Sequence, residues 1–218
     1  MRAVLLDFNG TMLFDSSLHA EAWSKIYQDL YPEDAKPLDT SVVCGPNNDT
    51  ILKNMAPHLT PAERTEWSEK KEAMYRRACK TKTEKLQLVK GTEEFLQYLQ
   101  DHKIPYGLAS ASIKSNIDFY FDTYGLDRWF EKEQVVYDDG TYANKGAMHL
   151  ECARRLGVDI RDCLLVEDSP GSIAHAKQNG AGCIVAIGSS APKAKLFELG
   201  ADHYIHDFSE FDCAWLQF

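Results

Sequence analysis

Short apolar runs recur along this chain and alternate with segments of helical periodicity, and this alternation limits the possible folds more than any other feature. The runs are residues 3–8, 104–109, 163–166 and 183–187. Each is short and almost continuously apolar, as strands buried on both faces are. The segments between them, such as 92–99, place apolar residues at helical spacing. Because strands alternate with helices, the sequence predicts an α/β fold with a mainly parallel sheet.

One segment, from about residue 14 to 88, interrupts the alternation. It contains helical patterns, such as 20–30 and 61–80, and no convincing run for a buried strand. The sequence therefore predicts a core domain of residues 1–13 and 89–218 and a small all-helical domain of residues 14–88. Because the insertion follows the first strand directly, we expect it to form a cap over the carboxyl ends of the strands, where open α/β sheets bind ligands.

Length and charge exclude several classes of protein. The chain has 218 residues, enough for one large domain or for a main domain with a small partner. Its 33 acidic and 24 basic residues give a formal charge of −9, which disfavours nucleic acid as the main partner. The sequence shows neither a signal peptide nor the roughly 20 consecutive apolar residues of a membrane helix, so we expect no membrane partner and a cytoplasmic location.

Six cysteines are spread along the chain without a C-x-x-C pair: Cys44, Cys79, Cys152, Cys163, Cys183 and Cys213. This spacing fits neither a zinc knuckle nor the dense disulfide framework of a small secreted domain. We therefore expect reduced thiols, with Cys163 and Cys183 in the core because both lie in predicted strands.

Acidic residues end two of the predicted strands. Asp7 comes at the end of the first run, before a turn at Gly10, and Glu167 and Asp168 follow the run 163–166. A single acidic residue at a strand end often only caps the following turn. Two such ends are more informative, because on neighbouring parallel strands Asp7 and Asp168 would converge. An oxygen-rich site of this kind suits Mg²⁺.

A hydroxyl group ends a third predicted strand. Ser110 follows the run 104–109, and Ala111 and Ser112 come next, where we expect a helix to begin. The hydroxyl and the amides of this segment could receive a phosphate. The alternative is that Ser110 or Ser112 only caps the helix.

Taken together, these residues resemble the four signature motifs of the haloacid dehalogenase superfamily, whose fold is a Rossmann-like parallel sheet with an inserted cap. The resemblance rests on the order and separation of residues 7–11 (DFNGT), Ser110, Lys145 and residues 167–169 (EDS). Within the superfamily, the helical insertion, His19 and Trp23 resemble the β-phosphoglucomutase-like phosphatases.

The resemblance implies a catalytic and metal-binding set. Asp7 would be the nucleophile that accepts the phosphoryl group as an aspartyl phosphate, and Lys145 would neutralise charge on the transferring group. Mg²⁺ would be held by Asp7, Asp168 and the main-chain carbonyl of Asn9, with Glu167 supporting these ligands. The residues that would contact phosphate or substrate are Thr11, His19, Asn48, Ser110 and Ala111.

Asn9 departs from the pattern of the family, in which the residue two after the nucleophile is a second aspartate that exchanges protons. An amide cannot do this near neutral pH, and losing such a group typically costs about 10²–10⁴-fold in rate. Three explanations stay open. The asparagine is native and a cap residue such as His19 or a good leaving group makes up for it; or it is an engineered replacement; or the protein only binds a phosphorylated ligand.

The segment 42–50 resembles the specificity loop of β-phosphoglucomutases, which place an arginine there for a second phosphate. This chain has Asn48, and a neutral amide cannot form a bidentate ion pair. Lys70 or Lys71 could supply charge instead, although the mixed-charge run around them predicts a solvated helix face. The mutase interpretation is therefore the weaker one.

The sequence predicts a Mg²⁺-dependent phosphohydrolase of a small phosphorylated metabolite, with a sugar phosphate favoured. The alternatives are a phosphomutase of hexose 1-phosphates and a catalytically silent phosphometabolite-binding protein. A dehalogenase would not need the pair Glu167 and Asp168, and phosphonate cleavage would need a cap lysine that forms a Schiff base. We expect a monomer or a weak homodimer.

Overall fold

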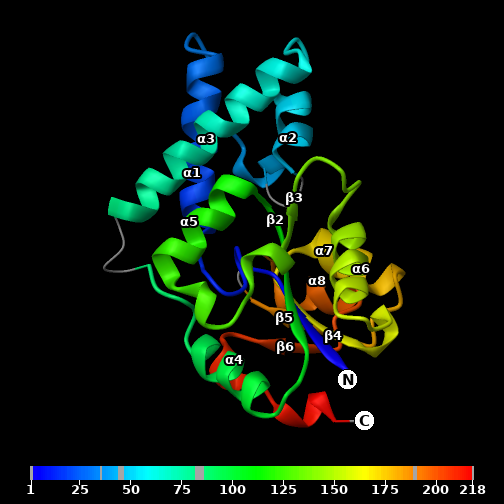
Figure 1. The fold of residues 1–218 in the computed structure, drawn as a ribbon. Helices are drawn as coiled ribbons and strands as arrows, with labels where there is room; N and C mark the ends of the chain where they lie inside the picture. Colours follow the sequence, from blue (N-terminus) through cyan, green and yellow to red (C-terminus); the bar gives the residue numbers. More distant parts are fainter. Residues whose placement is uncertain (1, 35, 44–46, 82–85, 189–190, 218) are drawn as a thin grey trace. The chain divides into compact units, whose positions relative to one another are not determined.

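The computed structural model describes residues 2–34, 36–43, 47–81, 86–188 and 191–217 (Figure 1). Its contacts divide the chain into two compact units. The core unit comprises Met1–Phe14 and Gln87–Phe218, and the helical unit comprises Asp15–Leu86. That the helical unit acts as a cap stays a prediction.

The core unit contains a six-stranded parallel sheet of order β3-β2-β1-β4-β5-β6. This confirms the predicted α/β class. The strands are β1 (Ala3–Leu6), β2 (Tyr106–Ile113), β3 (Val136–Asp138), β4 (Cys163–Glu167), β5 (Cys183–Ile187) and β6 (His203–Ile205). Every residue of β1, β4 and β5 is buried, which is why these strands read as uninterrupted apolar runs.

Strand β2 differs from its prediction. The sequence predicts a strand that ends at Ser110, but β2 continues to Ile113, and its register with β3 shifts between Ser110 and Ile113. Ser110 and Ser112 therefore lie in the strand, and helix α5 begins only at Lys114. Small polar residues carry no apolar periodicity, so only the pairing with β3 extends the strand.

Helices cover both faces of the sheet, and their bounds are α4 (Thr92–Asp101), α5 (Lys114–Tyr124), α6 (Lys145–Arg155), α7 (Pro170–Gln178) and α8 (Lys193–Glu198). The helices α6, α7 and α8 lie on one face and share an apolar cluster with the strands, whereas α4 and α5 lie on the other (Figure 1). Two side-chain caps fix helix starts: Asn144 accepts from the amide of Ala147, and Ser169 accepts from the amide of Ser172. These caps place the first turns of α6 and α7 beside the acidic strand ends.

The helical unit has its own apolar core. Its helices are α1 (Ser16–Leu30), α2 (Asn48–Met55) and α3 (Pro61–Thr81), and no strand occurs among its described residues. The core consists of Trp23, Ile26, Ile51, Leu52, Ala56 and Leu59. Burial of this cluster explains why the insertion forms a compact unit.

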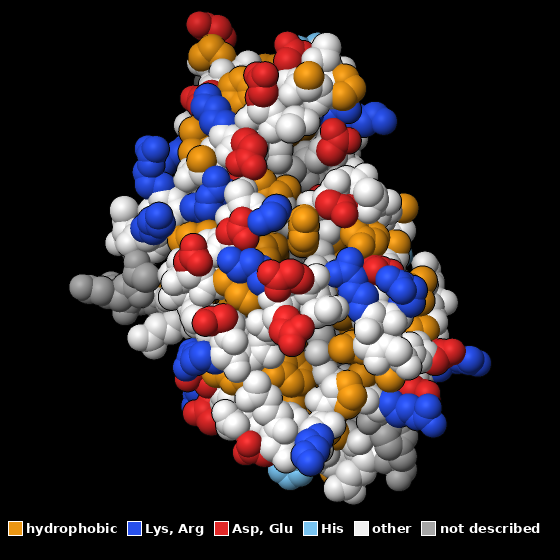
Figure 2. Space-filling view, in the orientation of Figure 1, with side chains coloured by type: hydrophobic (Ala, Val, Ile, Leu, Met, Phe, Trp, Pro, Cys, Tyr) orange, Lys and Arg blue, Asp and Glu red, His pale blue; other side chains and the backbone are white. Residues whose placement is uncertain are grey.

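The described cysteines, which exclude Cys44, are free thiols, and Cys163 and Cys183 are buried as predicted. Acidic and basic side chains are interspersed on the face shown in Figure 2. Across the part of the chain that the structure describes, no helix is both long and apolar enough to cross a bilayer.

Candidate active site

The acidic residues of β1 and β4 meet at one edge of the sheet. The two strands are neighbours in register, with Leu6 opposite Val166, so Asp7 and Glu167 follow side by side. One carboxylate oxygen from each of Asp7, Glu167 and Asp168 lies within 4.8 Å of the others, and all three residues are buried. The structure thus brings together the acidic residues that the sequence singled out.

The ammonium group of Lys145 forms ion pairs with two of these carboxylates. Lys145 Nζ forms an ion pair with Asp7 Oδ1 and lies 3.3 Å from Glu167 Oε1. Burial raises the pKa of Asp7 to about 7; the neighbouring Lys145 opposes this rise, and the Glu167 carboxylate adds to it. The Asp7 and Glu167 carboxylates therefore share the single ammonium of Lys145.

The donor set fits a hard divalent cation. Within the described residues, the buried Glu167 Oε2 has no hydrogen-bond partner. A buried carboxylate oxygen without a partner is costly, and an oxygen-only cluster is what Mg²⁺ prefers. Asp7, Glu167 and Asp168 are the residues that could hold such an ion.

A tight turn follows Asp7. Gly10 has φ of 77°, and a Cβ atom at this position would overlap the Asp168 carboxylate. Glycine is therefore required both for the backbone angle and for the close approach of Asp168. After the turn, the buried Thr11 places Oγ1 at 3.5 Å from Asp7 Oδ2.

His149 is a site residue that the sequence interpretation missed. It lies one helical turn after Lys145 in α6, and its Nε2 is 2.8 Å from Glu167 Oε1. Burial lowers the pKa of His149, so the neutral ring donates its Nε2 hydrogen to the carboxylate. The i, i+4 spacing from Lys145 was the available signal, because such residues share a helix face.

Asn9 contacts two residues from distant parts of the core unit. Its Nδ2 donates to the hydroxyl of Tyr120 at 2.8 Å, and Ser112 Oγ donates to its Oδ1 at 2.8 Å. Tyr120 is a second residue of this region that the sequence interpretation missed.

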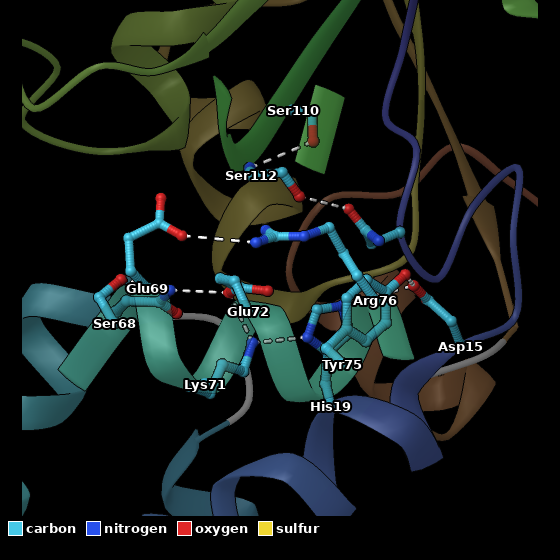
Figure 3. Close-up of polar contacts among 12 residues, drawn as sticks. Asp15, His19, Ser68, Glu69, Lys71, Glu72, Tyr75, Arg76, Ser110 and Ser112 are labelled. Carbon is cyan, nitrogen blue, oxygen red and sulfur yellow. Dashed lines mark hydrogen bonds and ion pairs between the residues drawn. The ribbon is translucent and has the colours of Figure 1, made fainter. Parts of the chain in front are cut away.

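The phosphate-binding candidates of β2 lie where the strand ends. Ser110 is buried, and its Oγ accepts a hydrogen bond from the amide of Ser112 at 3.2 Å (Figure 3); Ala111 is exposed. Helix α5 has Ile113 as its N-cap residue and no side-chain cap. The alternative that Ser110 or Ser112 only caps this helix is therefore wrong.

The helical unit contains a buried charged cluster, and this overturns part of the prediction for the run 69–72. Lys71 is 2% exposed and Glu72 3%, whereas Lys70 is exposed as expected. Lys71 Nζ donates to Glu72 Oε1 at 2.7 Å. The residues Lys71, Tyr75 and Cys79 recur every four positions, which turns them to the inner face of α3.

The predicted substrate residues of the helical unit are engaged within it (Figure 3). Lys71 Nζ lies 2.7 Å from His19 Nδ1, and His19 Nε2 is 3.4 Å from Asp15 Oδ2. An ammonium can only donate, so His19 accepts at Nδ1 and directs its Nε2 hydrogen to Asp15. Asn48 Nδ2 donates to Ser68 Oγ at 2.9 Å and to Glu72 Oε1 at 2.7 Å.

Comparison with known proteins supports the predicted resemblance. The model of the haloacid dehalogenase-like hydrolase family matches residues 1–180. Among curated proteins, YhcW, a candidate phosphatase of Bacillus subtilis (strain 168), is 29% identical over 126 residues, or 58% of this chain. The match spans 56% of the length of that relative.

Solved structures resemble the whole chain. A family IA, variant 3 HAD hydrolase from Entamoeba histolytica HM-1:IMSS has a TM-score of 0.89 and 26% identity, with 99% of this chain and 97% of that chain covered. A β-phosphoglucomutase from Clostridium difficile has a TM-score of 0.79 and 18% identity, with 100% and 96% covered. The second likeness is one of fold.

Proposed function

This chain belongs to the haloacid dehalogenase-like hydrolase family, and from this premise we propose that it is a Mg²⁺-dependent phosphohydrolase of small phosphorylated metabolites, sugar phosphates among them. The observation that carries the proposal is the cluster of Asp7, Glu167 and Asp168 with Lys145 paired to Asp7. The name of the Bacillus subtilis relative agrees with this activity.

The metal would be held by Asp7, Asp168 and the carbonyl of Asn9, with Glu167 supporting them. When bound, Mg²⁺ supplies positive charge that stabilises a phosphoryl group in transfer. The unpartnered Glu167 Oε2 supports this assignment, because a cation would compensate a buried oxygen that otherwise destabilises the site.

Each of these residues of the core unit would have its own role in phosphoryl transfer. An Asp7 carboxylate oxygen attacks phosphorus, the bond to the leaving oxygen breaks, and an aspartyl phosphate forms. Lys145 offsets the negative charge on the nucleophile and on the phosphoryl oxygens. Ser110, Ala111 and Thr11 would bind the phosphate, and water would then cleave the bond between phosphorus and Asp7.

The phosphomutase alternative has weaker support. It needs a cationic group in the helical unit for a second phosphate, and the Asn48 amide already donates to Ser68 and Glu72. The charge of Lys71 is shared with the Glu72 carboxylate. Residues that are already neutralised offer little charge to a phosphate.

The test is a panel of phosphate esters assayed with Mg²⁺ for inorganic phosphate release, in the native chain, Asp7→Asn and Asp168→Asn. We expect phosphate release by the native chain but not by Asp7→Asn or Asp168→Asn, and none after chelation by EDTA. Asp122→Asn is the matched control, because the side chain of Asp122 is 81% exposed. Undiminished activity in Asp7→Asn would refute the proposal, whereas Mg²⁺-dependent ligand binding without product would identify a silent binding protein.

A further inference from the structure

The side chain of Asn9 closes a ring of three hydrogen bonds. Its Nδ2 donates to Tyr120 Oη, and Ser112 Oγ donates to its Oδ1, both at 2.8 Å. The two hydroxyl oxygens lie 3.2 Å apart. Since the single hydroxyl hydrogen of Ser112 points to Asn9, the third bond is donated by Tyr120 to Ser112. Within the ring, each member therefore donates once and accepts once.

This ring is complementary to an amide. An ionised aspartate at position 9 has no hydrogen to donate to Tyr120, so it would accept from both hydroxyl groups. The contact between Ser112 and Tyr120 would then have no hydrogen. The amide of Asn9 thus completes a ring that an ionised aspartate would open.

The ring is anchored in the core unit. Tyr120 is fully buried and stacks on Phe8, the residue before Asn9, with ring centroids 4.2 Å apart. Ser112 is also buried, in the irregular end of β2. Burial of both partners holds the amide in one place, two residues after the nucleophile Asp7.

An amide in this place restricts the chemistry of the first step. An alkyl phosphate releases an alkoxide, which needs a proton as its bond to phosphorus breaks. The His19 ring, the alternative proton donor named above, directs its Nε2 hydrogen to Asp15 and accepts from Lys71 at Nδ1. The transfer is therefore easiest when the leaving group is stable as an anion.

We propose that this chain takes phosphoryl groups from metabolites whose leaving group departs as a stable anion, the acyl phosphates first, and reacts slowly with sugar phosphate esters. The inference rests on the proposed function and narrows its substrate class. In the first step an Asp7 oxygen bonds to phosphorus, and the leaving oxygen keeps the electron pair and departs as a carboxylate. No proton is transferred.

The second step is slow for the same reason. Water attacks phosphorus, the bond to Asp7 breaks, and the water proton passes to the phosphate product. Asn9 cannot accept that proton in the transition state, so this step loses general base catalysis. The aspartyl phosphate should accumulate whenever the first step is fast.

The experiment compares leaving groups in the native full-length chain with Mg²⁺. With p-nitrophenyl phosphate we expect a burst of p-nitrophenolate close to one per chain, followed by slower release. With acetyl phosphate, intact-protein mass should show one added phosphoryl group. With glucose 6-phosphate, formation of the phosphoenzyme should be about 10²–10⁴-fold slower than with the aryl ester.

The variant Asn9→Asp should abolish the burst and narrow the difference between aryl and alkyl esters. Asn54→Asp makes the same chemical change at an exposed position of α2 and should leave the burst intact. Equal rates for alkyl and aryl esters in the native chain would overturn the inference while leaving the phosphohydrolase proposal standing. No reaction with p-nitrophenyl phosphate, acetyl phosphate or glucose 6-phosphate in either form would overturn the phosphohydrolase proposal itself. Because the leaving groups are compared in the native chain, the inference is tested even if Asn9→Asp does not fold.

Discussion

Both units of this protein bury charged side chains, but they balance them differently. In the core unit, Asp7 and Glu167 share the ammonium of Lys145, and Glu167 Oε2 has no partner among the described residues. In the helical unit, the ammonium of Lys71 contacts both the Glu72 carboxylate and the His19 ring. Charge left uncompensated indicates a site that binds an ion, whereas compensated charge of similar burial indicates a structural network.

The largest effect should come from Lys145→Met. Removing the cation beside Asp7, the proposed nucleophile, should lower kcat/KM for p-nitrophenyl phosphate about 10³-fold. In metal-free buffer it should also cost about 3–5 kcal/mol of unfolding free energy, because buried carboxylates lose their partner. Urea unfolding with and without Mg²⁺ should show the metal restoring much of this loss. Lys114→Met, at a 65% exposed side chain, is the control.

Lys71→Met should lower the unfolding free energy about as much as Lys145→Met does, but Mg²⁺ should not restore the loss. It leaves Glu72 buried without its ammonium, and breaking a buried pair costs about 3–5 kcal/mol. Lys70→Met, which removes a half-exposed pair with Asp29, should cost no more than about 1 kcal/mol. Recovery of Lys71→Met by Mg²⁺ would contradict the distinction between the two clusters.

Mg²⁺ alone should stabilise the native chain. At a concentration about 100 times the dissociation constant, binding adds about 2.7 kcal/mol to the unfolding free energy. Calorimetric titration and thermal unfolding should both lose this response in Asp168→Asn and keep it in Glu72→Gln. If Asp168→Asn responds to Mg²⁺ as the native chain does, the ion binds at another site.

The buried Glu72 of the helical unit should make the stability of the protein depend on pH in the acid range. Burial by itself raises the pKa of Glu72, but the charge of Lys71 and the hydrogen bonds from Asn48 and Lys71 outweigh it and lower the pKa to about 2. A carboxylate with a lowered folded pKa stabilises the protein above its ordinary value of 4.5, and this is lost as pH falls toward 2. Between pH 6 and pH 2 the unfolding free energy of Glu72→Gln should therefore fall by about 2 kcal/mol less than that of the native chain. Parallel curves for the two proteins would contradict this.

The smallest effect should come from His149. His149→Leu removes the hydrogen bond to Glu167 and should weaken Mg²⁺ binding about tenfold, the lower end for partners of metal ligands. His149→Gln can still donate to the carboxylate and should recover part of the affinity. His102→Leu, at an exposed position, should change nothing measurable in the same titration.

The sequence interpretation succeeded where local pattern and fold agree. The buried strands β1, β4 and β5 could be predicted because each residue in them is buried and apolar side chains run without interruption. The strands β3 and β6 could not, since each has three residues and is only partly buried. A segment that short carries no recognisable period.

The same limit applies to the site. The meeting of Asp7 and Asp168 could be predicted because parallel strands bring their carboxyl ends to one edge. The contacts of Asn9 with Ser112 and Tyr120 could not, because they join residues 103 and 111 positions apart through the irregular end of β2 and the packing of α5.

The amino-acid sequence alone determined the alternation of strands and helices, the acidic strand ends and the amide at position 9, because periodicity and residue chemistry are local properties. Only the tertiary structure decided which charges are buried and with what partner. Lys70 and Lys71 are adjacent and chemically identical, yet only Lys71 turns into the helical core. The free energy of a charged group depends on what surrounds it, and only the folded chain determines those surroundings.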